Sequence, residues 1–255
     1  MVDTYRADIL LVEQQLSSSR THAQSLIRAG CVYCLDSGAR VLIKKASQLL
    51  HSDSHLVVEQ DEQHRYVSRG GLKLAYMLER ANISVAKKIA LDVGQSTGGF
   101  SDCLLQAGAG LVVGVDVGHG QLATILRERE NLICLEGINA RSLPATQLLD
   151  YTNALGFDLA VMDVSFISQS LILPNLIPLI KPGGYLISLV KPQFEVGKAG
   201  IGKNGLVKNT ALYQEVEQRL KSLCVDGQLS VEYYCESPIT GGDGNREFLL
   251  CARRL

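Results

Sequence analysis

A repeated alternation of apolar runs and helical segments between residues 88 and 191 constrains the fold of this chain more than any other feature. Each run is short enough for one strand, and each but the last is followed by a helical pattern within a few residues. The runs are "KIALDVG" (88–94), "LVVGVDVG" (111–118), "NLICLEG" (131–137), "FDLAVMDVSF" (157–166) and "GYLISLVK" (184–191). Near-continuous Val, Ile and Leu in strands separated by helices predicts a parallel sheet buried on both faces.

Two later runs predict how this sheet is completed. "QLSVEYYCES" and "REFLLCARRL" are joined by a Gly-rich connection. Such a pair is typical of an antiparallel hairpin, which we expect to close the sheet. The expected fold class is α/β.

The first sixty residues have a different texture. Residues 6–29 read as two short helices, and Gly30 ends the second. The runs "CVYCL", "RVLIK" and "HLVVE" then predict a small curled sheet. The polar segment "EQDEQHRYVSRGG" is typical of a linker. We therefore expect a small domain at 1–60, a linker at 61–72 and the large domain at 73–255.

Composition excludes several classes of protein. Hydrophobic residues make up 46% of the chain, yet no apolar run approaches the roughly 18 residues that cross a bilayer. The start, "MVDTYRADILLVEQQ", lacks the pattern of a signal peptide. An odd number of cysteines, seven, fits a reducing compartment, and the Cys31 and Cys34 pair has no second pair to complete a zinc site. We expect a cytoplasmic protein without a metal or a membrane partner.

The end of the first strand suggests a nucleotide-like cofactor. In "LDVGQSTGGF" an acid, Asp92, precedes a glycine-rich turn that opens a helix. The spacing G-x-x-x-G-G differs from the G-x-G-x-x-G of dinucleotide enzymes, which counts against NAD and an oxidoreductase. Asp116 ends the second strand, where an acid that binds ribose hydroxyls is expected. A ribose without a pyrophosphate favours S-adenosylmethionine, although glycines and acids also end elements in any α/β protein.

The expected cofactor contacts lie in the glycine-rich turn, at the ends of the second and fourth strands, and in the "GINARS" turn after the third. They are Asp92, Gly94, Ser96, Thr97, Gly98, Gly99, Asp116, Val117, Asn139 and Asp163.

Four charged residues suggest a catalytic group. They are Lys73, Asp163, Lys191 and Glu247. Asp163 and Lys191 interrupt runs that should be buried, where an unpaired charge costs several kcal/mol. A solvated surface position is the alternative for any one of them, but convergence above the sheet would explain all four.

The motifs "SRGGLKL", "DVGQSTGGF", "VVGVDVG", "MDVSFIS", "LVKPQFE" and "NREFLL" carry a resemblance to known families. The large domain resembles the FtsJ-like ribose 2'-O-methyltransferases, whose Lys-Asp-Lys-Glu tetrad matches the four charged residues. The whole chain resembles the TlyA family, and its first sixty residues resemble an S4 RNA-binding domain. The resemblance implies a Rossmann-like S-adenosylmethionine-dependent methyltransferase domain, with a mostly parallel seven-stranded sheet, preceded by a small α+β S4 domain.

The same resemblance implies the activity. Members of the TlyA family methylate the 2'-hydroxyl of cytidines in ribosomal RNA. Lys191 would be the central residue, Asp163 would orient it, and Lys73 and Glu247 would position the ribose. We expect ribosomal RNA or ribosomal subunits as the partner, no protein partner, and a monomer.

Basic residues supply candidate RNA contacts, since lysine and arginine bind phosphate without reading bases. They are Arg6, Arg20, Arg28, Lys44 and Lys45 in the small domain and Arg65 and Arg69 in the linker. A solvated helix face is the alternative for each. The net charge of −1 neither favours nor excludes nucleic acid, because a local basic face fits a balanced total.

Two other functions stay open at this stage. The first is an RNA-binding ribosome assembly factor with a vestigial methylase fold, against which the glycine-rich turn, Asp116 and the four charged residues are all present. The second is a membrane-active hemolysin, since many members of the TlyA family carry that label. No apolar run supplies the membrane segment that it would need.

Overall fold

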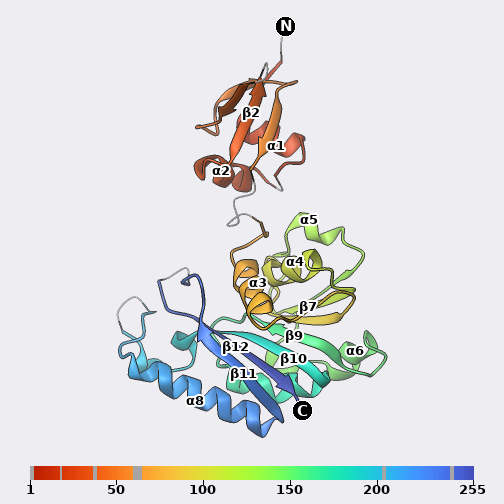
Figure 1. The fold of residues 1–255 in the computed structure, drawn as a ribbon, viewed down its shortest axis with the longest axis vertical. Coiled ribbons are helices and arrows are strands. Elements are labelled where there is room, and N and C mark those ends of the chain that lie inside the picture. Colours follow the sequence, from red (N-terminus) through yellow and green to blue (C-terminus); the bar gives the residue numbers. More distant parts are fainter. Residues whose placement is uncertain (1–2, 18, 37–38, 60–64, 203–204, 242–243) are drawn as a thin grey trace. The chain divides into compact units, whose positions relative to one another are not determined.

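The computed structural model describes residues 3–17, 19–36, 39–59, 65–202, 205–241 and 244–255. These residues form two compact units, the first reaching Arg65 and the second beginning at Tyr66, and each is described by itself (Figure 1). Residues 61–64 of the predicted linker lie outside the described residues. Its last three residues, 70–72, are instead the first turn of a helix.

The small unit is a mixed α and β structure. Its elements are β1 (Thr4–Arg6), α1 (Ala7–Glu13), α2 (Arg20–Arg28), β2 (Val32–Asp36), β3 (Ala39–Leu42), β4 (Leu49–His51) and β5 (His55–Val58). The two predicted helices are confirmed, and Gly30 follows the second with a positive φ of 75°. The three predicted strands form an antiparallel sheet in the order β3-β2-β5, while the short pair β1 and β4 was not predicted.

A buried carboxylate joins the first two helices of this unit. The side chain of Asp8 in α1 is fully buried and accepts hydrogen bonds from Arg6 (2.9 and 3.0 Å), Arg20 (3.3 Å) and Gln24 (2.8 Å). The Arg6 guanidinium beside it holds the pKa of Asp8 well below its usual range. Asp8 therefore fixes the start of α1 against α2 beside the apolar core of the unit.

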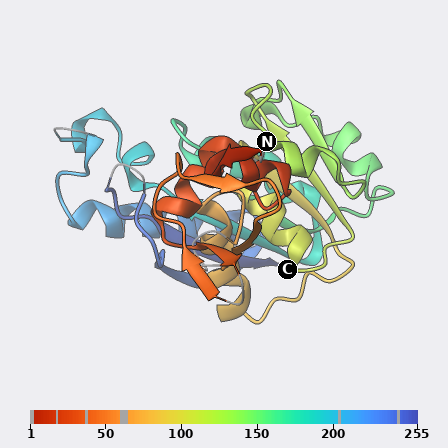
Figure 2. The same ribbon diagram turned by 90° about the horizontal axis from the view of Figure 1, so that it is seen from above.

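The large unit contains the predicted seven-stranded sheet. Its strands are β6 (Ile89–Val93), β7 (Leu111–Asp116), β8 (Leu132–Glu136), β9 (Phe157–Met162), β10 (Ile180–Val190), β11 (Leu229–Glu236) and β12 (Phe248–Arg254). The order is β11-β12-β10-β9-β6-β7-β8, with β11 and β8 at the edges. Seen from above, the C-terminal part in blue and the segment around β8 in green lie on opposite sides of the large unit (Figure 2). The first five strands are parallel, and β12 runs antiparallel to both β10 and β11. The α/β fold class and the closing hairpin are confirmed.

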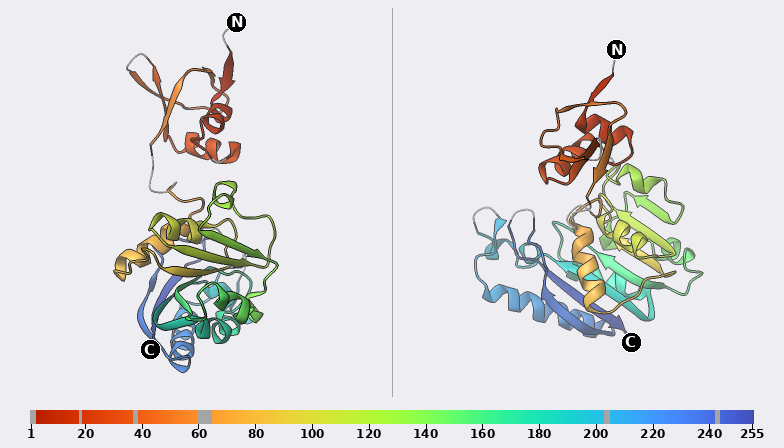
Figure 3. Two further views of the ribbon diagram at one scale, coloured as in Figure 1. Left: turned by 90° about the vertical axis from the view of Figure 1, so that its right-hand side faces the viewer. Right: turned by 45° about the horizontal axis from the view of Figure 1, so that its top comes forward.

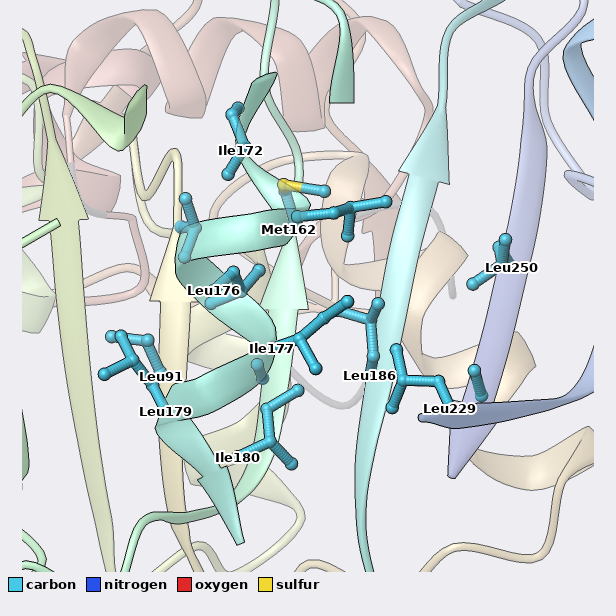
Figure 4. Close-up of a cluster of buried hydrophobic side chains, with 14 of the residues drawn as sticks. Leu91, Met162, Ile172, Leu176, Ile177, Leu179, Ile180, Leu186, Leu229 and Leu250 are labelled. Atoms are coloured by element: carbon cyan, nitrogen blue, oxygen red, sulfur yellow. The ribbon is translucent and has the colours of Figure 1, made fainter. Parts of the chain in front are cut away.

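Helices cover both faces of the sheet, as its continuous apolar strands require. They are α3 (Gly70–Arg80), α4 (Gly99–Gln106), α5 (Thr124–Arg127), α6 (Ala145–Asp150), α7 (Leu173–Leu176) and α8 (Ala211–Asp226). Leu74 of α3 and Phe100 of α4 belong to one apolar cluster, whereas Leu148 of α6 and Leu220 of α8 belong to another. The ribbons of α3 and α4, in yellow, and of α8, in blue, lie on different sides of the strands (Figure 3). Leu91, Met162 and Leu186 pack in the second cluster, from three neighbouring strands (Figure 4).

One glycine at the end of the predicted linker has a packing role. Gly71 lies in the first turn of α3 against Tyr66, and a Cβ atom there would overlap the tyrosine side chain. Gly71 thus allows a close approach and does not mark a flexible linker. None of the helices in the described part of the chain is both long and apolar enough to cross a membrane.

We predict that Asp8→Ala destabilises the small unit by about 2–3 kcal/mol, because three side chains lose a buried acceptor. Hydrogen exchange of residues 3–59 should accelerate, while residues 88–162 keep wild-type exchange. Because the folded pKa of Asp8 is lowered, its contribution is present above about pH 4 and is lost as the pH falls. A difference from wild type that persists unchanged at low pH would contradict this account.

Candidate active site

The site begins where the backbones that follow the neighbouring parallel strands β6 and β9 approach each other closely, at Gly94 and Asp163. We call this close approach the crossing. Gly94 follows β6 with φ +84°, a conformation that glycine adopts without strain. A Cβ atom on Gly94 would lie 2.5 Å from the backbone oxygen of Asp163, which follows β9. The Asp163 amide also donates to the Val93 carbonyl at 3.0 Å. Glycine at 94 therefore allows the two strand ends to meet.

Two cavities open at this crossing and share part of their walls. The smaller, which we call the lysine cavity, has a volume of about 280 Å³ and is lined by Lys73, Lys191 and Arg69, among others. The larger, which we call the Asp116 cavity, has a volume of about 520 Å³. The shared lining residues are Gly94, Ser96, Asp163 and Ser165. A group bound in one cavity would thus lie next to a group bound in the other.

The four predicted catalytic residues form two ion pairs. Lys191 Nζ lies 2.6 Å from Asp163 Oδ1, and Lys73 Nζ lies 2.5 Å from Glu247 Oε2. Lys73, Asp163 and Lys191 line the lysine cavity, while Glu247 is buried as the partner of Lys73. Pairing offsets the desolvation of each charge, which is the condition that the interrupted apolar runs required.

Lys191 has a second partner that the sequence did not reveal. Its Nζ donates a hydrogen bond to Ser165 Oγ at 2.9 Å. Asp163 and Ser165 both follow β9, whereas Lys191 follows the neighbouring strand β10. An ion pair and a hydrogen bond to one segment therefore fix the direction of the lysine amine from the adjacent strand.

The Asp116 cavity has the groups that a ribose and an aromatic base require. Asp116 accepts hydrogen bonds from the amides of Ser96 (2.8 Å) and Gly118 (2.7 Å), which hold its carboxylate in place. Each carboxylate oxygen has a further lone pair for a hydroxyl group. Asn139 and the exposed Val117 also line the cavity. These residues fit the adenosine part of S-adenosylmethionine.

Most of the predicted cofactor contacts line one of the two cavities. Those that do are Gly94, Ser96, Thr97, Gly99, Asp116, Val117, Asn139 and Asp163. Asp92 and Gly98 lie on neither wall. Gly98 instead caps α4 with φ +93°, where a Cβ atom would overlap Leu126.

Asp92 lies buried beneath the glycine-rich turn. Its Oδ2 accepts a hydrogen bond from Ser101 Oγ at 2.7 Å, and Ser101 in turn accepts one from Gln95 Nε2 at 2.8 Å. Among the described residues, Oδ1 of Asp92 has no hydrogen-bond partner. Burial raises the pKa of Asp92 to about 7, Ser101 opposes the shift, and the charges of Asp163 and Asp116 add to it. The structure thus shows Asp92 as part of the support below the turn.

An exposed aromatic residue, Phe166, lines the Asp116 cavity. Phe166 is 90% exposed and has φ +64°, a strained conformation for a bulky residue. Its ring lies 4.9 Å from that of Phe194, centroid to centroid. A strained and exposed phenylalanine is costly for stability alone, which indicates a role in binding. The sequence motif "MDVSFIS" contained this signal, but Phe166 read as the end of a strand.

The predicted RNA contacts divide into two groups. Arg28, Lys44, Lys45, Arg65 and Arg69 are exposed, and Arg69 lines the lysine cavity. The side chains of Arg6 and Arg20 are 40% and 57% exposed, but both are bound to Asp8. Because Asp8 neutralises part of their charge, Arg6 and Arg20 are the weaker candidates for phosphate contacts.

Comparison with known proteins gives consistent results. The FtsJ-like methyltransferase family model matches residues 66–254. The chain is 43% identical over 250 residues to the "Putative rRNA methyltransferase YqxC" of Bacillus subtilis, covering 96% of this chain and 84% of that protein. It is 39% identical over 254 residues to the "16S/23S rRNA (cytidine-2'-O)-methyltransferase TlyA" of Mycobacterium tuberculosis, covering 97% and 89%. A solved structure, "Putative hemolysin from Streptococcus thermophilus", matches with a TM-score of 0.71 and 39% identity, covering 100% of this chain and 90% of that one.

We predict that Asp92→Asn removes a pH dependence of folding stability. Because the folded pKa of Asp92 is raised to about 7, wild-type stability should fall as the pH rises from about 4 to 7, by an amount on the order of 3 kcal/mol. Asparagine stays neutral, so the variant should gain on wild type across this window. Urea unfolding at pH 5 and pH 8 measures the difference, and a constant difference would contradict the assignment.

Proposed function

The chain belongs to the FtsJ-like methyltransferase family, and on this premise we propose that it methylates the 2'-hydroxyl of a cytidine in ribosomal RNA. Its cofactor is S-adenosylmethionine. The observation that carries the proposal is the meeting of the two cavities at Asp163 and Ser165, with Lys191 bound to both. A methyl donor and a ribose hydroxyl could therefore lie side by side with a lysine amine between two fixed acceptors.

The Asp116 cavity is the proposed cofactor site. Asp116 would accept hydrogen bonds from the ribose hydroxyls of the cofactor, and the exposed faces of Val117 and Phe166 would contact its base. S-adenosylmethionine supplies an electrophilic methyl group on a cationic sulfur. The carboxylates of Asp116 and Asp163 on the cavity wall suit a cationic ligand.

The lysine cavity is the proposed site of the target ribose. A ribose hydroxyl holds its proton tightly and is a poor nucleophile, so the site must stabilise charge on its oxygen or remove the proton. Lys191 Nζ would do so at the 2'-oxygen, while Asp163 and Ser165 keep the amine aimed. The buried pair of Lys73 and Glu247 would hold the ribose from the other side. Alignment of the two reacting groups supplies much of the acceleration.

Two observations support ribosomal RNA as the substrate. The Mycobacterium tuberculosis relative is named for the 2'-O-methylation of cytidine in 16S and 23S rRNA, and the similarity covers most of both chains. The small unit, which resembles an S4 domain in sequence, presents Lys44 and Lys45 to solvent. Exposed cations of this kind contact phosphate and fix the register of an RNA.

We predict that Lys191→Ala lowers methyl transfer at least a hundredfold but changes cofactor affinity by no more than about threefold, because Lys191 acts on the acceptor oxygen. Radiolabel transfer to ribosomal subunits that lack the modification measures the first, and calorimetry measures the second. Label at a nucleotide that resists alkaline cleavage would identify the 2'-oxygen. Lys181→Ala is the matched control, since Lys181 pairs with Asp158 at the opposite end of β10. Equal losses of transfer and cofactor affinity in Lys191→Ala would refute the role.

We predict that Lys44→Glu with Lys45→Glu weakens binding to ribosomal subunits by about tenfold and flattens its salt dependence, since two phosphate contacts would be lost. Cofactor affinity should be unchanged. The control is Lys87→Glu with Lys88→Glu, an adjacent lysine pair just before β6, at the end of the strand opposite the cavities. Binding that is equally weakened in both double variants would point to net charge and not to a defined contact.

A further inference from the structure

Glu195 is a buried charge that the proposed reaction does not use. It lies four residues after Lys191, and its side chain is only 1% exposed. A buried carboxylate is costly unless every lone pair is used, and here the partners are numerous. Glu195 accepts from the Gln169 amide (2.7 Å), Ser168 Oγ (2.7 Å) and Arg219 (2.7 Å).

These partners join the two segments that carry the Lys191 site. Ser168 and Gln169 follow β9 and come shortly after Asp163 and Ser165 along the chain. Glu195 follows β10, close behind Lys191. Its carboxylate thus bridges the segment that holds the lysine and the segment that holds the two acceptors of that lysine. Arg219 connects the bridge to α8 and also donates to the Glu195 backbone carbonyl at 2.9 Å.

Gln169 extends the bridge back to the end of β10. Its side chain is buried, and its Nε2 donates to the Leu189 carbonyl at 2.8 Å. Its Oε1 accepts from Ser188 Oγ at 2.8 Å. Gln169 therefore contacts β10 at Ser188 and Leu189, shortly before Lys191 in the chain. Its backbone amide donates to Glu195, four residues after Lys191.

The pairing of β9 with β10 ends before it reaches Asp163 and Lys191. Pairing between β9 and β10 stops at Ser188 with Met162. Lys191 comes directly after the last pair of β10 with β12, Val190 with Phe248, and Asp163 comes directly after the last pair of β6 with β9. The ladders thus set the strand ends, but no pairing of β9 with β10 sets the distance between these two side chains. Side-chain contacts must fix it instead. Besides the contacts of Lys191 itself and the ring contact between Phe166 and Phe194, the hydrogen bonds of Glu195 and Gln169 cross from one segment to the other.

We propose that Glu195 is a positioning residue that holds Lys191 in register with Asp163 and Ser165. The inference rests on the proposed methyl transfer. Loss of the carboxylate would let the two segments shift, and a displacement of about 1 Å at a reacting group can cost on the order of a hundredfold in rate. Residues 163–167 also line the Asp116 cavity, but Asp116, which ends β7, and Asn139, which follows β8, lie outside the bridged segments, so we expect cofactor affinity to change less than methyl transfer.

Glu195→Gln in the full chain tests the proposal. We expect kcat for methyl transfer to ribosomal subunits to fall at least tenfold, while KM for the subunits and Kd for S-adenosylmethionine stay within about threefold. Hydrogen exchange of the Gln169 amide should accelerate, because its acceptor loses its charge. A merely structural role would lower thermal stability without this split between kcat and KM.

Asp158→Asn is the matched control. Asp158 also accepts from a backbone amide, that of Ile89 (2.9 Å), and pairs with a cation, Lys181 (2.5 Å), but it lies at the other end of β9. Its kcat should stay within threefold of wild type. An equal fall in kcat in Asp158→Asn, or an unchanged kcat in Glu195→Gln, would overturn the proposal.

A second variant covers the case in which Glu195→Gln does not fold. Ser168→Ala removes one hydrogen bond to the same carboxylate and should lower kcat severalfold with KM unchanged; an unchanged kcat would then overturn the proposal. Hydrogen exchange of the Gln169 amide distinguishes a failure of the Glu195 proposal from a failure of the proposed methyl transfer. If the wild-type protein transfers no methyl group, the proposed function fails, and Gln169 exchange alone then shows whether Glu195 holds the segments together. Unchanged exchange in Glu195→Gln would overturn the bridge itself.

Discussion

The close crossing of the Gly94 and Asp163 backbones is the contact on which the rest of the site depends. Pairing of β6 with β9 ends at Val93 with Met162, and the next residue of each strand enters the crossing. Because Gly94 has no side chain, Asp163 can follow β9 directly over it. Asp163 thereby borders both cavities and meets Lys191 from the neighbouring strand. One glycine conformation thus brings the two cavities and the lysine within reach of a single carboxylate.

Several charged side chains are buried around this crossing. They differ in whether an oppositely charged partner lies beside them. Lys73, Glu247 and Glu195 are buried in ion pairs, which oppose the cost of desolvation. Asp92 has no cationic partner among the described residues and responds by a raised pKa. The ion pairs hold their charges at fixed positions, whereas burial raises the pKa of the lone Asp92 carboxyl to about 7. The arrangement concentrates fixed charge at the cavity walls and keeps it out of the strands.

Much of the fold could be predicted from the sequence, because apolar runs of strand length report burial directly. The ends of those runs also located Asp116, Asp163 and Lys191, since parallel strands bring their carboxyl ends to one edge. The partners of these residues could not be predicted in the same way. Nothing in the spacing of "LVKPQFE" shows that its glutamate bonds to Ser168 and Gln169, because that contact depends on how two loops fold beyond the sheet.

The errors of sequence interpretation have the same physical origin. The run 157–166 reads as one strand, but β9 ends at Met162 and Phe166 turns into a left-handed conformation. Gly70 and Gly71 read as linker, although a glycine is also needed where Tyr66 packs on a helix. Asp92 has the residue type and position of a cofactor ligand, yet its side chain turns toward Ser101. In each case the local pattern was read correctly, and a tertiary contact decided between two roles for the same residue.

Strand pairing and side-chain hydrogen bonds therefore determine different parts of the site geometry. Strand pairing places Asp163 and Lys191 just beyond the ends of the adjacent strands β9 and β10. Precision at the amine must come from contacts above the sheet, where Ser165 and the Glu195 bridge lie. Ser165, Gln169 and Glu195 all lie in the loops that follow β9 and β10, beyond the paired strands. Phe166 lies in the same loops. Its exposed side chain and strained backbone indicate that contacts with a substrate, and not packing in the core, determine the conformation of these loops.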